Sequence, residues 1–550
     1  FFDCPQIRAS RILKHDNATR YYRAFFLYDR QPFQEGTTVT TLSKTLRRSV
    51  LEGTVFICGA MVMTFEIIGS RILSPYIGAS TYVWTSLIGV ILGSLSLGYW
   101  LGGRTADRNP SMKVLSAVIM AAGGLIAVTV LIKEVVLSFV TAAPVGIELR
   151  SLFASIVLFA PASVALGFVT PYSVKLRLDS LSDTGKTVGR LYALSTIGSI
   201  LGTFAAGFIL IPFVGSLRTL YLIAGVLIAL AILLVPFAAT RTNLAIIIVF
   251  VLSIVGSEAN ALMLYKANGL HDIDTEYSRI QIFQTTDPKT GRPIRALATD
   301  PYFTQSAIFI DSDEPVLEYS RYYHLSRHFA GKLDDILVIG GAGYSVPKDL
   351  LSRYPEVKVD VVEIDPSMTT IARRFFRLQD NDRLRIFHED ARTFLNANRS
   401  GRYDAILVDA FGSLFAVPYQ LTTVEAIREM YRSLNESGVV ILNLGSAIQG
   451  PGSEFLEAEL ATYKAVFPYV GVFKVNREYD DRRLQNLIIV AARSSAALSF
   501  SSPDAEISAL LANRYEGVVR QTLPVLTDDL APVEYYNSTA QNIYLRENAK

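Results

Sequence analysis

The chain has 550 residues, of which half are apolar and 19% are charged, and its formal net charge is +2. This length exceeds that of one typical domain, and the mean hydropathy of +0.32 argues against an entirely soluble protein. The balanced charge and the lack of a basic stripe exclude nucleic acid as an expected partner. Two cysteines rule out a disulfide framework, and five histidines without ligand spacing lead us to expect no metal.

Residues 1–50 form a polar, basic arm, and a strongly apolar region follows at residues 51–265. Seven apolar runs are near the length that crosses a bilayer and predict a multi-span α-helical membrane domain, with spans at 52–70, 81–101, 114–132, 151–170, 191–213, 218–238 and 244–264. Glycines four residues apart predict closely packed helices at Gly89/Gly93, Gly98/Gly102 and Gly198/Gly202. The lipid bilayer is therefore the first expected partner.

Loop charges predict the orientation of these spans. Seventeen lysines and arginines lie in the arm and in the alternate loops that share its side, against four in the other loops. By the positive-inside rule, the N-terminus is expected in the cytoplasm. Seven spans would then place the soluble half outside. The seventh run contains Glu258 and Asn260, so whether it crosses stays open, and without it the soluble half would be cytoplasmic.

The second half of the chain has the pattern of a soluble α/β protein. Short strands with a turn at DPKTGRP predict a small β subdomain at residues 272–311. Strands and helices then alternate through residues 312–495, and residues 496–550 form a C-terminal extension. This alternation predicts a Rossmann-like, doubly wound parallel sheet that binds ligands at the carboxyl edge of its strands.

Three consecutive strand ends carry residues suited to a nucleoside. Gly340, Gly341 and Gly343 follow the first strand, where small residues let the backbone approach a ligand. Glu363 and Asp365 follow the second strand, in the position of an acid that accepts ribose hydroxyl groups, and Asp390 and Ala391 follow the third. The short glycine pattern and Asp390 favour an S-adenosyl-type nucleoside over NAD.

Residues 275–495 resemble the spermidine synthases, which are polyamine aminopropyltransferases with a class I methyltransferase-like fold. The chain after residue 50 resembles bacterial proteins in which such a domain follows a multi-span membrane region, through the segments 66–108, 189–215 and LTDDLAPVEYY (526–536). The resemblance implies a multi-pass protein of the bacterial plasma (inner) membrane. It also implies decarboxylated S-adenosylmethionine, or a related nucleoside, as co-substrate and a small amine as acceptor.

Residue by residue, the resemblance implies that the nucleoside side of the site is kept. Gln305 and Tyr322 match pocket positions, Glu363 matches the ribose acid, and Asp390 matches the acceptor of the adenine amine. Asp409, in ILVDAFGSLF (406–415), matches the first acid of a paired-aspartate loop. It is the expected catalytic base, with Tyr322 beside it.

The amine side departs from the family pattern at four positions. Gly343 stands where the family has aspartate, Tyr322-Tyr323-His324 replaces a tyrosine–histidine/glutamine–glutamate run, Gly412 replaces the second loop aspartate, and Ser278 replaces a glutamine. Since a protonated diamine needs carboxylates to hold it and to accept its proton, these changes bear directly on activity. Asp528 or Asp529 would be an alternative source of the second charge.

Three functions stay open from the sequence. The first is a membrane-anchored aminopropyltransferase whose amine-binding acids are partly lost. The second is a catalytically degenerate scaffold or subunit that binds membrane-protein partners. The third is a transporter, suggested by the loop segment GGRTADR (102–108), although a positive-inside signal explains that segment equally well.

Overall fold

The computed structural model describes residues 37–78, 80–143, 145–178, 184–235, 240–300, 303–397, 401–410, 417–494 and 499–547. The chain divides into two compact units, Phe1–Glu52 and Gly53–Lys550. The architecture described below is that of the second unit, apart from the start of its first helix.

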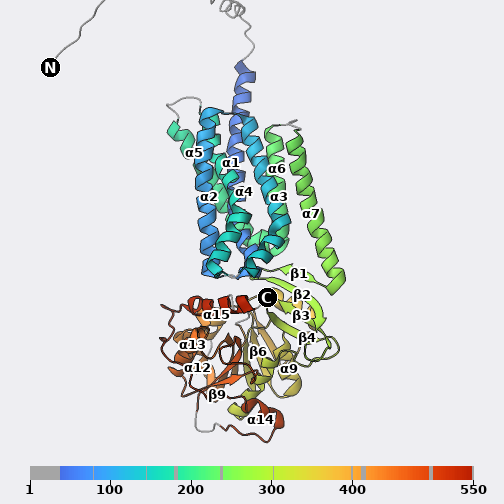
Figure 1. Ribbon diagram of the computed structural model, residues 1–550, viewed down its shortest axis with the longest axis vertical. Coiled ribbons are helices and arrows are strands. Elements are labelled where there is room, and N and C mark those ends of the chain that lie inside the picture. The colour runs from blue at the N-terminus through green and yellow to red at the C-terminus, as the bar shows by residue number, and fades with distance from the viewer. Residues whose placement is uncertain are drawn as a thin grey trace, which may run out of the picture. The chain divides into compact units, whose positions relative to one another are not determined.

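The apolar runs form the helices α1 (Thr37–Ile77), α2 (Thr81–Arg108), α3 (Met112–Ala142), α4 (Ile147–Arg177), α5 (Thr184–Ala205), α6 (Ser216–Leu234) and α7 (Arg241–Asn268). A π-helical segment, η2 (Ala206–Val214), continues α5. Within the described residues, seven helices are long and apolar enough to cross a membrane, as predicted. Figure 1 shows them aligned as a bundle.

Two of the three glycine pairs lie at close helix contacts. A Cβ atom at Gly98 or Gly102 would stand 2.3 or 2.5 Å from backbone oxygens of α4, and one at Gly198 or Gly202 would stand 2.1 or 2.3 Å from backbone oxygens of α1. These glycines therefore permit backbone contact that no larger residue allows. At Gly89 and Gly93 a Cβ would meet nothing within 4 Å, so the prediction is wrong for that pair.

After α7, four strands form an antiparallel sheet in the order β1 (His271–Asp274), β2 (Arg279–Thr286), β3 (Pro293–Ala298) and β4 (Thr304–Phe309). The sequence indicated the last three strands, whereas β1 is formed by four largely polar residues with no alternating pattern. Pairing with β2 decides its conformation. The predicted small β subdomain is thus a four-stranded meander.

The main sheet has seven strands in the order β10-β11-β9-β8-β5-β6-β7. Their bounds are β5 (Asp335–Ile339), β6 (Lys358–Val362), β7 (Leu384–Phe387), β8 (Tyr403–Val408), β9 (Leu434–Ser446), β10 (Tyr469–Lys474) and β11 (Gln485–Ala492). β11 runs antiparallel to both of its neighbours. The sheet is therefore mostly rather than wholly parallel, because the short β10–β11 connection holds no crossover helix.

Helices cover both faces of this sheet, as a doubly wound fold requires. Alternate residues of β5 belong to different cores, with Ile336 and Val338 in one and Leu337 and Ile339 in the other. The covering helices are α8 (Leu325–Ala330), α9 (Ser345–Arg353), α10 (Pro366–Phe375), α11 (Ala391–Ala397), α12 (Val424–Ser433), α13 (Glu454–Lys464), α14 (Ala505–Leu511) and α15 (Val533–Glu547), with 3-10 segments η3 (Glu318–His324) and η4 (Tyr419–Leu421).

Candidate active site

Strand register brings the predicted strand-end residues to one edge of the sheet. Ile339 pairs with both Val362 and Val408, and Val408 pairs with Leu442. The next residues along these strands are Gly340, Glu363, Asp409 and Asn443. The chain order reverses between β5 and β8, so this edge is the switch point at which open α/β sheets bind ligands.

Asp409 lies at the end of β8 between two uncharged donors. The hydroxyl group of Tyr319 donates to Asp409 Oδ2 across 3.1 Å, and the side-chain amide of Asn443 donates to Oδ1 across 3.3 Å. Burial raises the pKa of the Asp409 carboxyl to about 6, against the opposing effect of these hydrogen bonds and of Tyr323. At neutral pH this side chain is thus a largely ionised carboxylate whose pKa suits proton transfer.

The glycine loop after β5 packs closely on Asp409. Gly340 has a φ of +96°, and a Cβ atom there would stand 2.5 Å from the carbonyl oxygen of Asp409. Only glycine meets both demands. The loop and the acid are therefore held together by the backbone itself.

Glu363 organises the same loop from β6. One of its carboxylate oxygens accepts the backbone N–H groups of Gly341 and Ala342, at 2.8 and 3.1 Å, and the other accepts that of Asp365 at 2.9 Å. Burial raises the pKa of Glu363, and the three backbone hydrogen bonds oppose that effect. A carboxylate has about four acceptor positions, so roughly one remains for a ligand hydroxyl group.

Asp365 and Asp390 both cap helices. Asp365 Oδ1 accepts the N–H of Ser367 at the start of α10, while its buried Oδ2 has no hydrogen-bond partner among the described residues. Asp390 Oδ1 accepts the N–H of Thr393 in the first turn of α11, next to Ala391. Burial, then the charges of Glu276, Asp365 and Asp390, raise the pKa of Tyr277. Both capping acids therefore lie close enough to Tyr277 for their charges to affect its hydroxyl group.

Gly343 faces a filled space. A Cβ atom on it would stand 2.5 Å from the hydroxyl oxygen of Ser306 and 2.9 Å from the ring of Phe376. The Ser306 hydroxyl is itself hydrogen-bonded to that of Ser345 across 2.8 Å. An aspartate at this position has no room unless β4 or its neighbours shift.

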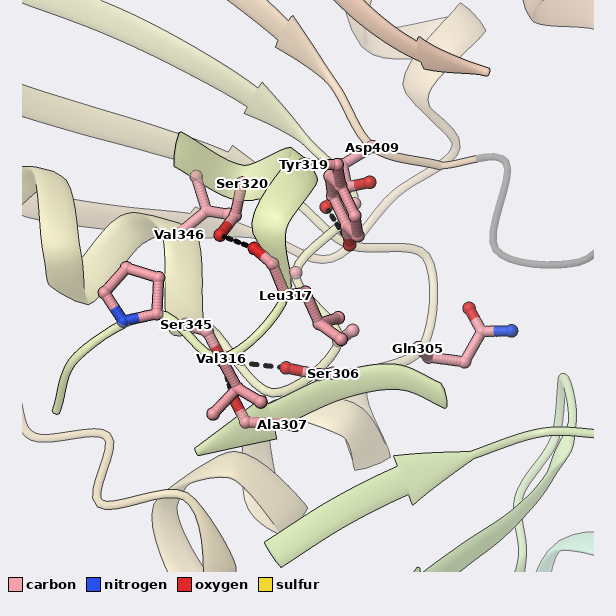
Figure 2. A pocket seen from close by; sticks show the side chains of 14 residues that line it. Gln305, Ser306, Ala307, Val316, Leu317, Tyr319, Ser320, Ser345, Val346 and Asp409 are labelled. Carbon is pink, nitrogen blue, oxygen red and sulfur yellow. Dashed lines mark hydrogen bonds between the residues drawn. The ribbon is translucent and has the colours of Figure 1, made fainter. Parts of the chain in front are cut away.

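A small pocket and a larger cavity open beside Asp409. Figure 2 shows the small pocket, with Tyr319 turned toward Asp409 and the Ser306–Ser345 contact on another wall. The adjoining cavity has a volume of about 590 Å³. Both spaces are lined by Gln305, Tyr319, Ala342 and Asp409. Gln305 therefore lines both spaces.

The C-terminal helix forms part of the wall of the larger cavity. Asn537 and Tyr544 of α15 line it, and the Tyr544 ring lies 4.8 Å from the ring of Phe303. At the start of α15, the Glu534 carboxylate accepts the backbone N–H of Thr81, the first residue of α2. The extension is thus a component of the site and is tied to the helical half.

The structure does not bring Tyr322 to the cavity. Its hydroxyl group donates to the Lys474 carbonyl across 2.8 Å and accepts from the Asn513 amide across 2.7 Å. The tyrosine that both lines the cavity and donates to Asp409 is Tyr319, three residues earlier in η3. Several tyrosines lie in this stretch, and no local sequence signal distinguishes them.

His324 also lies away from the cavity. Its imidazole contacts Asp349 of α9 across 2.8 Å and the Tyr354 hydroxyl across 3.1 Å. His324 therefore does not occupy the amine side of the site, and that prediction is wrong. Gly412 lies outside the described residues.

Neither acid of the C-terminal tail is among the described residues that line the two spaces beside Asp409. Arg392 binds both oxygens of Asp528, at 3.3 and 2.8 Å, and the Thr423 hydroxyl donates to one of them. Asp529 is exposed. In the part of the chain that the structure describes, no three His, Cys, Asp or Glu side chains are grouped to hold a metal ion.

Part of the chain is similar in sequence to a known family model and to curated proteins. Residues 318–476 match the family model described as "Spermine/spermidine synthase domain", so the chain contains a domain of this kind. A polyamine aminopropyltransferase of Vibrio vulnificus is 37% identical over 162 residues, which cover 29% of this chain and 52% of that protein. The chain thus spans about half the length of this relative.

A second relative resembles more of the chain. Polyamine aminopropyltransferase 1 of Streptomyces coelicolor is 24% identical over 437 residues, covering 72% of this chain and 76% of that protein. An alignment of this length extends into the helical half. A solved probable spermidine synthase of Corynebacterium glutamicum is 24% identical, with a TM-score of 0.38, and covers 49% of this chain and 94% of that one.

Proposed function

We propose that this chain, which carries a spermine/spermidine synthase domain behind seven apolar helices, is a membrane-anchored aminopropyltransferase. It would transfer an aminopropyl group from decarboxylated S-adenosylmethionine, or a related sulfonium nucleoside, to an amine. Gly340, Gly341, Gly343, Gln305, Glu363, Asp365, Asp390 and Ala391 would form the nucleoside side of the site. Asp409 would be the catalytic acid–base residue, and Tyr319, in place of Tyr322, its partner.

The observation that carries this proposal is the isolation of the Asp409 charge. No cationic side chain pairs with Asp409 among the described residues, although its carboxylate is largely withdrawn from water. A buried charge without a counter-ion is costly. Such a group persists where a ligand supplies the opposite charge, and a protonated amine or a sulfonium does so here.

The proposed reaction is a nucleophilic substitution at carbon. The lone pair of a neutral amine attacks the carbon next to the sulfonium sulfur, a C–N bond forms, and the C–S bond breaks with its electron pair left on sulfur. The new secondary ammonium then loses a proton to the Asp409 carboxylate. At pH 7 a carboxyl with a pKa of about 6 is about nine-tenths ionised and ready to accept it.

The remaining charges of the cavity favour an acceptor with a single cationic group. Of the other acids in the wall, Asp287 accepts hydrogen bonds from Thr290, and Glu318 pairs with Lys289. Amides such as Asn443, Asn486 and Gln485 form much of the lining near Asp409. We therefore infer that the acceptor is a monoamine with neutral hydrogen-bonding groups beyond its reacting nitrogen, and not a diamine with a second cationic group.

The proposal is tested with the purified full chain and a panel of amines. Decarboxylated S-adenosylmethionine is supplied, and released methylthioadenosine and alkylated amine are measured together by mass spectrometry. Monoamines are expected to react faster than putrescine, and Asp409→Asn is expected to remove turnover. Asp380→Asn, in an acid paired with Arg373 outside the cavity wall, is the matched control. Absence of both products with every amine would refute the enzymatic function.

A non-catalytic scaffold is the second candidate. It is favoured by the filled space opposite Gly343 and by the three backbone hydrogen bonds that already engage Glu363. In this case neither the nucleoside nor its analogues would bind. Calorimetry with methylthioadenosine separates the candidates, since heat that disappears in Glu363→Ala supports the enzyme and an absence of heat supports the scaffold.

We further propose the bacterial plasma membrane as the location, with the N-terminus in the cytoplasm and the synthase domain on the outer side. The support is the loop-charge asymmetry together with α7, whose length and composition suit a seventh span. Membrane-protein partners would then bind the bundle.

A further inference from the structure

A second cavity, separate from Asp409, lies where the end of α7 meets the small sheet and α10. Its volume is about 440 Å³, within the range of small-ligand sites. Residues Tyr265 to Gly269 of the α7 end form one wall, and residues of β1, β2 and β3 together with Phe375 form the others. No activity discussed above uses this space.

The ionisable side chains of this cavity that carry or can take up positive charge have no acidic neighbour in its wall. Lys266, His271 and Arg295 line it, and no acidic residue does. Arg295 gives one N–H group to the Phe375 carbonyl across 2.7 Å. Lys266 has no ion-pair or hydrogen-bond partner for its ammonium group among the residues that the structure describes. Burial and the charges of Arg374 and Arg295 lower the pKa of His271, as expected beside uncompensated positive charge.

The neighbouring cavity between the bundle and β1–β2 has a different character. It also contains arginines, but Asp272 and Asp274 line it with Arg279, and Arg279 pairs with Asp272. Its positive charges are therefore compensated within the protein. The cavity at the α7 end, in contrast, has basic groups and no acidic residue in its wall.

The place of the cavity along the chain indicates the source of an anion. Leu262, Met263, Leu264 and Tyr265 are exposed apolar or aromatic side chains at the end of α7, and Lys266 follows directly. In a membrane, exposed apolar side chains lie in the hydrocarbon region, and tyrosine and lysine at a helix end lie at the headgroup level. The cavity therefore opens where the phosphate groups of lipids are found.

We propose that this cavity binds the phosphate group of an anionic lipid, with Lys266 and Arg295 as its cationic ligands. Basic pockets beside membrane helices on the headgroup side are suited to such groups. The guanidinium of Arg295 keeps N–H groups for phosphate oxygens, and the ammonium of Lys266 supplies a point charge. Gln284, also in the wall, adds an uncharged donor.

The test uses the full chain in detergent, with phosphatidylglycerol and phosphatidylcholine added separately and bound lipids counted by native mass spectrometry. Preferential binding of phosphatidylglycerol is expected. Lys266→Glu should weaken it by about fivefold or more, since each basic residue near a headgroup contributes measurably. Lys358→Glu, in an exposed lysine at the start of β6, should leave it unchanged. Lys266 is the position chosen for the test. Replacing Arg295 would also remove its hydrogen bond to the Phe375 carbonyl and so change the fold as well as the site.

Equal binding of the two lipids, or identical phosphatidylglycerol binding by the wild type and Lys266→Glu, would overturn the proposal. A parallel titration with inorganic phosphate separates the two sources of the anion. Protection against thermal unfolding by inorganic phosphate, without retention of phosphatidylglycerol, would assign the cavity to a soluble phosphate compound and overturn the lipid assignment. High salt should weaken lipid binding, because an electrostatic interaction at an exposed site is screened.

Discussion

The hydroxyl group of Tyr319 donates a hydrogen bond to the carboxylate of Asp409 across 3.1 Å, from a 3-10 segment to a strand end 90 residues away in sequence. This contact stabilises the charged form of a carboxyl whose pKa burial has raised to about 6. The pair therefore sets the protonation state at the centre of the proposed site.

Removal of this hydroxyl should move the pH dependence of turnover. In Tyr319→Phe the ionised form of Asp409 loses a donor worth about 1.5–3 kcal/mol, so its pKa rises by about one unit or more. The acid limb of the pH–rate profile should shift to higher pH by that amount. Tyr322→Phe, which breaks only contacts to Lys474 and Asn513, should lower stability and leave the profile in place.

Neutralising Asp409 should stabilise the protein while abolishing turnover. The pKa of this acid is raised on folding, so its contribution is favourable below pH 3.8 and is lost as pH rises through about 6. Asp409→Asn should therefore raise the apparent melting temperature at pH 8, by the equivalent of about 1–3 kcal/mol, with little effect near pH 4. A melting temperature that falls at pH 8 would contradict this account of the burial.

A side chain at Gly343 should be costly. Gly343→Ala places a methyl group against Ser306 and Phe376, and overpacking of this kind costs about 1–3 kcal/mol. The additional change Ser306→Gly should recover part of the loss. Gly452→Ala is the matched control, since its Cβ meets only ordinary contacts from 3.5 Å outward. Equal melting temperatures for the two alanine variants would show that the space opposite Gly343 is open.

The tail acid Asp528 should matter for stability and not for the amine. Asp528→Asn weakens the contacts with Arg392 and Thr423, and we expect the apparent melting temperature to fall by roughly 2–4 °C. The KM for the amine should stay the same. A large rise in that KM, with unchanged nucleoside binding, would return Asp528 to the amine site.

In the proposed topology, whether α7 crosses the membrane decides on which side the domain after residue 270 lies. Protease added to sealed right-side-out cells should digest the chain after residue 270 if α7 crosses and the N-terminus is cytoplasmic. A lysis control shows that the domain is cleavable when reached. Full protection in sealed cells would place the domain in the cytoplasm and would reverse the proposed topology.

Features that depend on neighbouring residues were predictable from the sequence. The seven helices follow from the length of the apolar runs, because an apolar segment in a bilayer must satisfy its backbone hydrogen bonds internally and a helix does so within the segment itself. The alternation of strands and helices likewise predicted a doubly wound sheet, and with it a shared edge for Gly340, Glu363 and Asp409.

Features that depend on contacts between distant segments were decided by the tertiary structure. Tyr319 rather than Tyr322 reaches Asp409, Ser306 fills the space opposite Gly343, and Arg392 holds Asp528. β11 runs antiparallel to its neighbours, and α15 returns to the cavity wall. Each of these outcomes depends on which side chains meet after folding, and the spacing of residues along the chain carries no information about that.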